Sequence, residues 1–156
     1  ILGIQGGTKK VDELTSDLIA KGAKINGIWS QDWCGELFTY FGKQVYWNWE
    51  VDNTLYPNLR EQIKIWKKSN INFLGYINPY INHNGDMFQF AEENNYLVKN
   101  KDNSTFLTQA TSFKFGIVDL TNSKAYIWFK NIRSSIKQLI DNPRKHLASH
   151  QRIEPF

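Results

Sequence analysis

The chain has 156 residues and a formal net charge of +4, from 19 Lys and Arg against 15 Asp and Glu. Its hydrophobic share of 41% and charged share of 22% are typical of one folded domain and exclude a collagen-like or wholly disordered chain. Cys34 is the only cysteine, which excludes a disulfide scaffold and predicts a reducing, cytoplasmic compartment. No apolar run approaches the ~20 residues of a membrane span, so we expect no membrane partner.

The charge pattern and the hydrophobic period divide the chain into two parts. Positive charges are scattered over segments typical of solvated helix surfaces, and no nucleic-acid motif accompanies them, so we expect no nucleic-acid partner. After residue 140 the hydrophobic period stops and basic residues become denser. We therefore predict one partial domain over residues 1–140 and an unpatterned basic tail over residues 141–156. Because Ile1 already lies in an apolar run, we expect the domain to be part of a longer protein.

Short apolar runs alternate with segments of helical period along the domain. Strands are predicted at residues 1–4, 25–29, 71–77 and 116–118. Helices are predicted at about 9–21, 57–68 and 123–139, with a short one near residue 86. Between them, residues 34–56 and 97–115 are predicted to be irregular, the latter with a hairpin turn at residues 102–103.

Single residues predict where these helices begin and end. Thr8 is a candidate N-cap of the first helix, and Gly22 supplies its left-handed stop. Pro57 is suited to the first position of the second helix, and Asp86 is a candidate cap of the short one.

Alternating strands and helices imply parallel strands joined by right-handed crossovers. This spacing alone fits both an open doubly wound sheet and a (β/α)8 barrel. Each predicted strand ends in polar or aromatic residues, and barrel enzymes assemble their sites at that edge, which favours the barrel. About four β/α units form the N-terminal half of such a barrel. Half a barrel would expose two unpaired strand edges, through which we expect self-association.

Two segments that follow predicted strands carry groups suited to a ligand. The glycines of residues 3–7 could cradle a phosphate or simply make a tight turn, and Gln5 among them could point its amide into a cleft. Gln31, Asp32 and Trp33 combine an amide and a carboxylate for sugar hydroxyls with an indole for the apolar face of the ring. The alternative is that Asp32 caps a helix or pairs with a cation, while the tryptophans fill the core.

The remaining chemical groups give weaker signals. Asp119 could be a second carboxylate of a glycosidase, but its place before Thr121 and a strong helix favours a cap or a turn. The three histidines lack the spacing of a metal site, and Cys34 has no histidine partner in view. We therefore expect no metal, no cofactor and no thiol nucleophile.

Six segments taken together form one ordered series of motifs: residues 3–7 (Gly-Ile-Gln-Gly-Gly), 27–33 (Gly-Ile-Trp-Ser-Gln-Asp-Trp), 47–49, 56–57, 75–80 and 118–122. This series resembles glycoside hydrolase family 31, and within it the bacterial sulfoquinovosidases and their α-glucosidase relatives. The resemblance runs from residue 1 to about residue 139. It implies a (β/α)8 barrel and a retaining α-glycosidase that uses two catalytic aspartates.

Carried over residue by residue, the resemblance implies that Gln5, Gln31 and Trp47 line the sugar pocket. Asp32 and Trp33 belong to the same motif as Gln31 and are expected to orient the sugar with it. Asp119 matches a family position that is structural rather than catalytic, in agreement with a role in a turn.

The chain departs from the sulfoquinovosidase pattern at the contact for an anion. In those enzymes a basic residue that binds the sulfonate stands three residues before the pocket tryptophan, where this chain has Gln44. Lys43 is adjacent, but an extended segment would point it the other way. A neutral contact in place of a charged one weakens binding of a sulfonate by about 1.5–3 kcal/mol. Lys43 and Gln44 therefore remain possible anion contacts, and a neutral α-glucoside is an equal candidate.

A second departure concerns the catalytic groups. In the family, the helix that matches residues 123–139 leads into a strand that carries the nucleophile aspartate, and residues 141–156 do not match that strand. The acid/base aspartate, which lies further along, is missing as well. We therefore predict a fragment of a retaining α-glycosidase for an α-glucoside or sulfoquinovoside, inactive alone. The alternative is a non-catalytic sugar-binding remnant that assembles with a partner chain.

Overall fold

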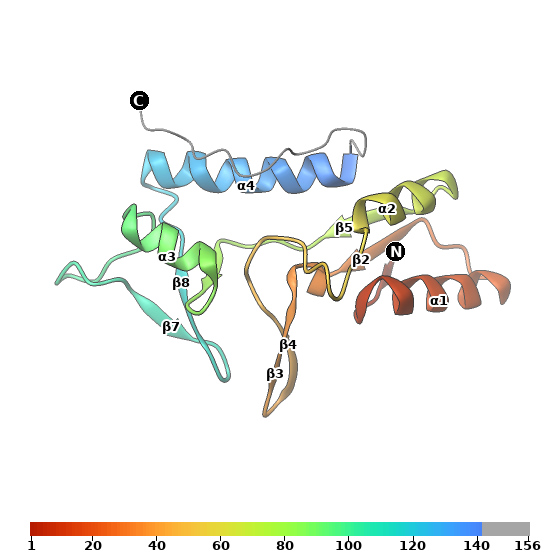
Figure 1. The fold of residues 1–156 in the computed structure, drawn as a ribbon, viewed down its shortest axis with the longest axis horizontal. Helices are drawn as coiled ribbons and strands as arrows, with labels where there is room; N and C mark the ends of the chain where they lie inside the picture. The colour runs from red at the N-terminus through yellow and green to blue at the C-terminus, as the bar shows by residue number, and fades with distance from the viewer. Residues whose placement is uncertain (142–156) are drawn as a thin grey trace.

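The computed structural model describes residues 1–141, so that the predicted tail lies, apart from Asp141, outside the described residues. At its centre is a parallel sheet whose strands, in spatial order, are β1 (Leu2–Gly3), β2 (Gly27–Ser30) and β5 (Asn72–Gly75). Leu2 lies opposite Ile28, and Ile28 opposite Phe73, so that apolar side chains line one face. The first three predicted strands are confirmed as parallel neighbours (Figure 1).

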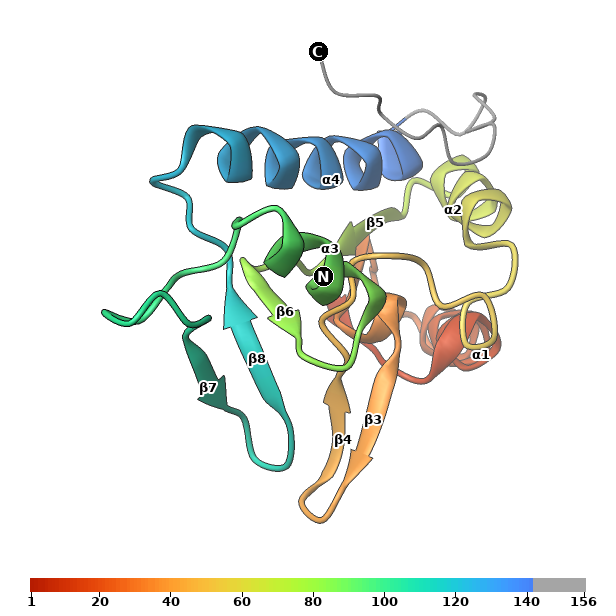
Figure 2. The same ribbon diagram turned by 60° about the vertical axis from the view of Figure 1, so that its left-hand side comes forward.

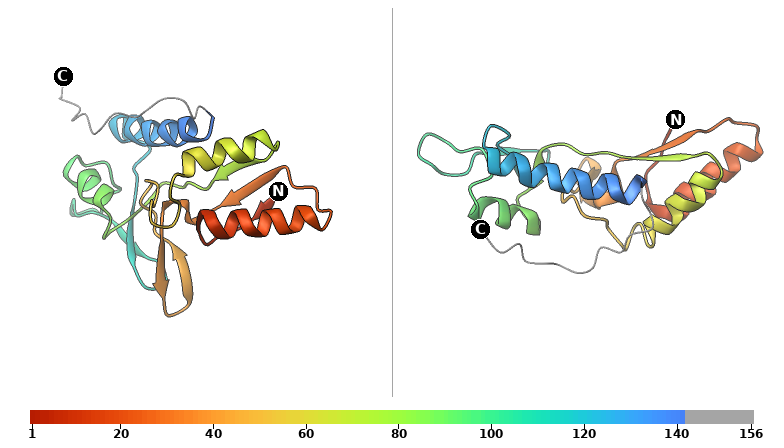
Figure 3. Two further views of the ribbon diagram at one scale, coloured as in Figure 1. Left: turned by 45° about the vertical axis from the view of Figure 1, so that its right-hand side comes forward. Right: turned by 90° about the horizontal axis from the view of Figure 1, so that it is seen from above.

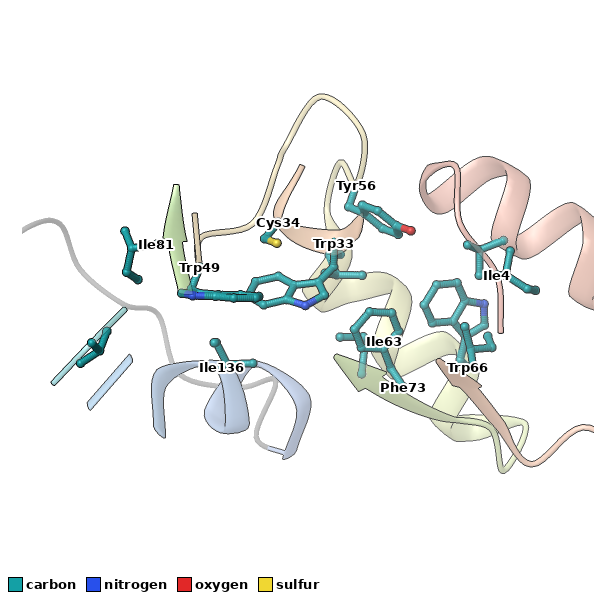
Figure 4. Close-up of a cluster of buried hydrophobic side chains, with 14 of the residues drawn as sticks. Ile4, Trp33, Cys34, Trp49, Tyr56, Ile63, Trp66, Phe73, Ile81 and Ile136 are labelled. Carbon is teal, nitrogen blue, oxygen red and sulfur yellow. The ribbon is translucent and has the colours of Figure 1, made fainter. Parts of the chain in front are cut away.

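Two helices, α1 (Gly7–Ala20) and α2 (Leu59–Lys68), lie on the same side of these strands (Figure 3). The ring of Trp66 stacks on that of Phe73 with their centroids 5.9 Å apart, which holds α2 against β5. The indole nitrogen of Trp66 also donates to Oδ1 of Asp12 at 3.1 Å and so links α2 to α1. Figure 4 shows these rings in the core, next to the buried side chains of Ile4 and Ile63.

The first helix ends as predicted but begins differently. Gly22 has a φ of 89°, and its N–H donates to Ile19, while the N–H of Ala23 reaches back to Leu18, which completes a left-handed helix stop. At the other end the N-cap is Gly6, with a φ of 111°. Thr8 is the second residue of the helix, so the prediction that it caps the helix is wrong.

The next two helices also begin at other residues than predicted. The N-cap of α2 is Asn58, in a left-handed conformation with a φ of 53°, so Pro57 precedes the helix instead of opening it. Helix α3 (Asp86–Glu93) has Gly85 as its N-cap, and Asp86 is its first residue. A carboxylate in the first turn still interacts favourably with the positive end of the helix dipole.

Antiparallel strands occur in and beside the segments that were predicted to be irregular. Strands β3 (Glu36–Thr39) and β4 (Gly42–Val45) form a hairpin. A second antiparallel sheet has the order β6 (Tyr80–Asn82), β8 (Lys114–Ile117), β7 (Leu107–Gln109). Figure 2 shows both hairpins extending from the same side of the molecule, away from α4 (Ser123–Asp141). The predicted turn at residues 102–103 is confirmed, because Lys99 and Thr105 form an antiparallel bridge across it.

The prediction of a fourth parallel strand at residues 116–118 is therefore wrong. Gly116 pairs with Ile81 on one side and Leu107 on the other, antiparallel in both cases. The apolar run was identified correctly, but its partner is the short strand after Pro79, for which the sequence analysis predicted no strand. The described residues thus contain three parallel strands in place of four.

The last helix, α4, packs against β5 and α2 (Figure 1). Ile136 of this helix is buried in the core, and a Cβ placed on Gly75 would lie 3.7 Å from Cδ1 of Ile140. Amphipathic spacing predicted this helix, and α4 confirms it over residues 123–139. None of the helices within residues 1–141 combines the length and the apolar character that crossing a membrane requires.

Candidate functional site

Gln5 and Gln31 meet at the carboxyl edge of the parallel sheet. Gln5 follows β1 and Gln31 follows β2, and the carboxyl ends of neighbouring parallel strands lie at one edge. Nε2 of Gln5 donates a hydrogen bond of 3.0 Å to Oε1 of Gln31. Within the described residues this is the one hydrogen bond of either side-chain amide, so both keep donor and acceptor capacity for a ligand.

A hollow of about 370 Å³ adjoins this amide pair; its lining is Gly3, Ile4, Gln5, Lys10, Leu14, Trp29 and Gln31. Trp29 is 40% exposed and offers an indole beside the two amides. Trp29 was not among the predicted site residues. The period of two in β2 was the available signal: Ile28 faces the helices, so Trp29 faces the opposite side, next to Gly3, which has no side chain to cover it.

Asp32 is held inside the protein. It is 2% exposed, and its Oδ1 accepts hydrogen bonds from the hydroxyls of Tyr56 and Ser30, the latter at 2.8 Å. Its Oδ2 accepts the backbone N–H of Gly6 at 2.7 Å. Burial raises the pKa of Tyr56 above its ordinary value, and the bond to Asp32 raises it further, so the hydroxyl stays a donor. A carboxylate in this environment supports the site and does not face a sugar, which corrects our expectation of direct contact.

Trp33 also lies in the core. It is 1% exposed, its indole nitrogen donates to the carbonyl of Tyr76 at 2.8 Å, and its ring packs against Trp49 at 6.2 Å (Figure 4). The alternative interpretation, a core tryptophan, therefore describes Trp33 better than a place in the pocket.

Trp47 belongs to a separate cluster of rings. Its indole makes edge contacts with Tyr80, Phe113 and Phe115, with centroids 5.2, 5.3 and 4.7 Å away. Its backbone is left-handed, with a φ of 52°, a conformation that costs a bulky residue about 1–3 kcal/mol. Strain of this kind persists where surrounding packing fixes it, and it concentrates at ligand sites.

The two possible anion contacts lie on β4. Nζ of Lys43 forms an ion pair with Glu36 across the hairpin and lies 4.9 Å from the centre of the Phe38 ring. Gln44, the next residue of the strand, points to the opposite face. The extended segment therefore separates the two side chains as the sequence analysis expected, and the charge of Lys43 is already paired.

The glycines before α1 form a tight turn. Gly6 and Gly7 both have positive φ angles, and the N–H of Gly6 is bound by Asp32. A phosphate at this helix start would meet that buried carboxylate. The turn interpretation is therefore confirmed over the phosphate cradle.

The three remaining candidates, Asp119, Cys34 and His83, have contacts that give them a role in the fold. Oδ1 of Asp119 accepts the backbone N–H and the hydroxyl of Thr121, which confirms a turn, and the side-chain bond to Thr121 lowers the pKa of the carboxyl. Burial raises the pKa of the Cys34 thiol to about 12. The ring of His83 packs on Phe88, and residues 1–141 hold no group of three or more His, Cys, Asp or Glu placed for a metal ion.

Parallel strand–helix units with amides at their carboxyl edge place this chain in the class of α/β domains, whether open sheet or barrel. Within that class, it belongs to the glycosyl hydrolases family 31 TIM-barrel domain family, whose model matches residues 5–144.

Two curated relatives are sulfoquinovosidases. The one from Escherichia coli (strain K12) is 43% identical over 131 residues, and the one from Agrobacterium fabrum is 37% identical over 129. These matches cover 84% and 83% of this chain but 19% of each relative. A solved family 31 sulfoquinovosidase from E. rectale, in complex with an aza-sugar inhibitor, superposes with a TM-score of 0.82 at 39% identity, over 89% of this chain and 20% of that one. The chain therefore spans about a fifth of the length of these relatives.

Proposed function

We propose that the chain is the N-terminal part of the barrel of a retaining α-glycosidase, and that Gln5, Gln31 and Trp47 line its sugar pocket. The observation that carries the proposal is the Gln5–Gln31 amide pair, which adjoins the hollow beside Trp29. Two amides can exchange hydrogen bonds with vicinal hydroxyls, and an indole covers the apolar face of a pyranose. The identity with sulfoquinovosidases supports a glycoside as the ligand.

Hydrolysis with retention requires two carboxyl groups ~5–5.5 Å apart, one as nucleophile and one as acid and base. The carboxylates that follow β2 and β8 have other roles: Asp32 is bound by three donors, and Asp119 holds a turn. We therefore expect no turnover of a nitrophenyl α-glucoside or α-sulfoquinovoside by this chain. Turnover that disappears on Asp32→Asn or Asp119→Asn substitution would contradict the assignment.

The sugar is an α-glucoside or a sulfoquinovoside, and position 44 is the residue that selects between them. With Lys43 paired to Glu36, no free cation adjoins Gln44 on β4. Gln44→Arg is expected to tighten binding of methyl α-sulfoquinovoside by roughly 10-fold or more, because a charged donor replaces a neutral one. Calorimetric titration against methyl α-glucoside, whose affinity should not change, is the matched control.

The second candidate function is a non-catalytic sugar-binding remnant that pairs with a partner chain. The open edges of the parallel sheet favour it, since β1 and β5 each have one strand neighbour among the described residues. Calorimetry with glucosides together with light scattering separates the two: a monomer without sugar affinity rules this candidate out. The single cysteine is the basis on which we assign either form to the cytoplasm.

A further inference from the structure

One buried carboxylate joins the two loops that carry the amide pair. Asp32 directly follows Gln31 in the chain, and it accepts the N–H of Gly6, the residue directly after Gln5. Its two oxygens bind different segments: Oδ2 accepts from the loop after β1, while Oδ1 accepts from Ser30 at the end of β2. Each glutamine is therefore one peptide bond away from a group that Asp32 fixes.

Tyr56 fixes that carboxylate in turn. The side chain of Tyr56 has no exposed surface, and its hydroxyl donates to Oδ1 of Asp32. The hydroxyl of Ser30, 2.8 Å from that of Tyr56, also directs its proton at Oδ1. The segment that carries Tyr56 is anchored to α1 as well, because the N–H of Thr8 donates to the carbonyl of Leu55 at 3.1 Å.

From this geometry we propose that Tyr56 is a positioning residue of the sugar site: through Asp32 it sets the distance between Gln5 and Gln31. The inference rests on the proposed function for its consequence in sugar binding, but the positioning of the two amides can be tested without any sugar. Free amides of two surface glutamines would sample many rotamers, and holding both loops at fixed separation reduces the ordering that a sugar must impose on binding.

The test is nuclear magnetic resonance of the ¹⁵N-labelled full chain, in wild type and in Tyr56→Phe. The variant removes one hydroxyl and keeps the ring in the core. We expect hydrogen exchange at the Gly6 amide to accelerate about tenfold and the side-chain amide signals of Gln5 and Gln31 to shift toward those of free glutamine. Ser30→Ala, which removes the other hydroxyl bound to Oδ1, should change the same signals in the same direction.

Tyr46→Phe is the matched control, because the Tyr46 hydroxyl donates to the carbonyl of Asn84 outside the cluster. It should leave Gly6 and both glutamine amides unchanged. The proposal is overturned if Tyr56→Phe leaves these signals as in wild type, or if exchange rises equally at core amides such as that of Ile28, because the hydroxyl would then contribute to overall stability alone.

A titration with methyl α-glucoside separates this proposal from the function on which it rests. If wild type binds the sugar, Tyr56→Phe should weaken the affinity about tenfold and Tyr46→Phe should not change it. If wild type binds no glucoside while the amide signals respond as described, the proposed function fails and the positioning role stands.

Discussion

Gly7 occupies a position where the backbone leaves no room for a side chain. Its φ is 88°, and a Cβ placed on it would overlap the carbonyl oxygen of Leu55. The same carbonyl accepts the N–H of Thr8, so the contact cannot open without breaking a hydrogen bond. Gly7→Ala should therefore lower the free energy of unfolding by more than about 2 kcal/mol.

Urea denaturation of the purified chain measures this loss, and Gly22→Ala is the matched comparison. Gly22 also has a positive φ, of 89°, but a Cβ there meets nothing within 4 Å. It should cost only about 1 kcal/mol, the price of the left-handed backbone alone. Equal losses in the two variants would show that the contact with Leu55 relaxes freely.

Cys34 makes the stability of the chain depend on alkaline pH. Burial raises its pKa to about 12, from 9.0 for an exposed thiol. The unfolded chain therefore releases this proton first as the pH rises above about 9, so the free energy of unfolding decreases, by about 3 kcal/mol near pH 11. Tyr56, whose pKa burial also raises, acts in the same direction. Denaturation at a series of pH values, repeated with Cys34→Ala, should show a smaller decline in the variant; an unchanged slope would exclude Cys34 as a cause.

At the scale of an element, α1 carries a polar group in its buried face. Thr15 is 2% exposed, and its hydroxyl has no hydrogen-bond partner among the described residues. Because an unpaired buried hydroxyl costs about 1–3 kcal/mol, Thr15→Val, which keeps the shape, should raise the free energy of unfolding by about 1 kcal/mol. Thr15→Ser keeps the hydroxyl, loses the methyl group and should be less stable than wild type. Thermal and urea unfolding of wild type and both variants measure these differences. A Thr15→Val variant that is less stable than wild type would refute the prediction.

The helices and the parallel strands could be predicted because their signals are local. Spacings of three and four place Val11, Ile63 and Trp66 on buried faces, and apolar runs mark β1, β2 and β5. The hairpin β3–β4 could not, because its turn carries Tyr40 and Phe41 where a short hairpin favours Asn-Gly. An apolar run also does not reveal its strand partner, which is why β8 was assigned to the wrong sheet.

The candidate site could likewise be predicted only in part. Gln5 and Gln31 could be paired in advance, because both follow parallel strands and such strands end at one edge. The burial of Asp32 could not, because the hydroxyl that binds it lies 24 residues away, on Tyr56, in a segment without regular period. Trp33 presents the same difficulty, because its inward orientation depends on distant residues: the ring of Trp49 packs against it, and the carbonyl of Tyr76 accepts its indole N–H.

For the whole molecule, the parallel sheet is open in two respects. Its outer strands β1 and β5 each lack a second strand neighbour within residues 1–141, and Trp29 and Leu74 stand 40% and 38% exposed on the face away from α1 and α2. In a closed barrel both edges pair and the inner face is filled by side chains from the other strands. The same openness that places Trp29 beside the hollow thus leaves apolar surface and unpaired backbone groups in water.

We therefore expect the isolated chain to self-associate through this sheet in a concentration-dependent way, which light scattering with sedimentation would measure. Leu74→Lys places a charge on the open face and should raise the concentration for half-association at least about tenfold, because pairing would bury an unpaired ammonium group. The control is Phe38→Lys, since Phe38 is 79% exposed on the β3–β4 hairpin and lies outside the parallel sheet. Should Phe38→Lys disperse the assembly while Leu74→Lys leaves it intact, the hairpin and not the open sheet is the contact surface.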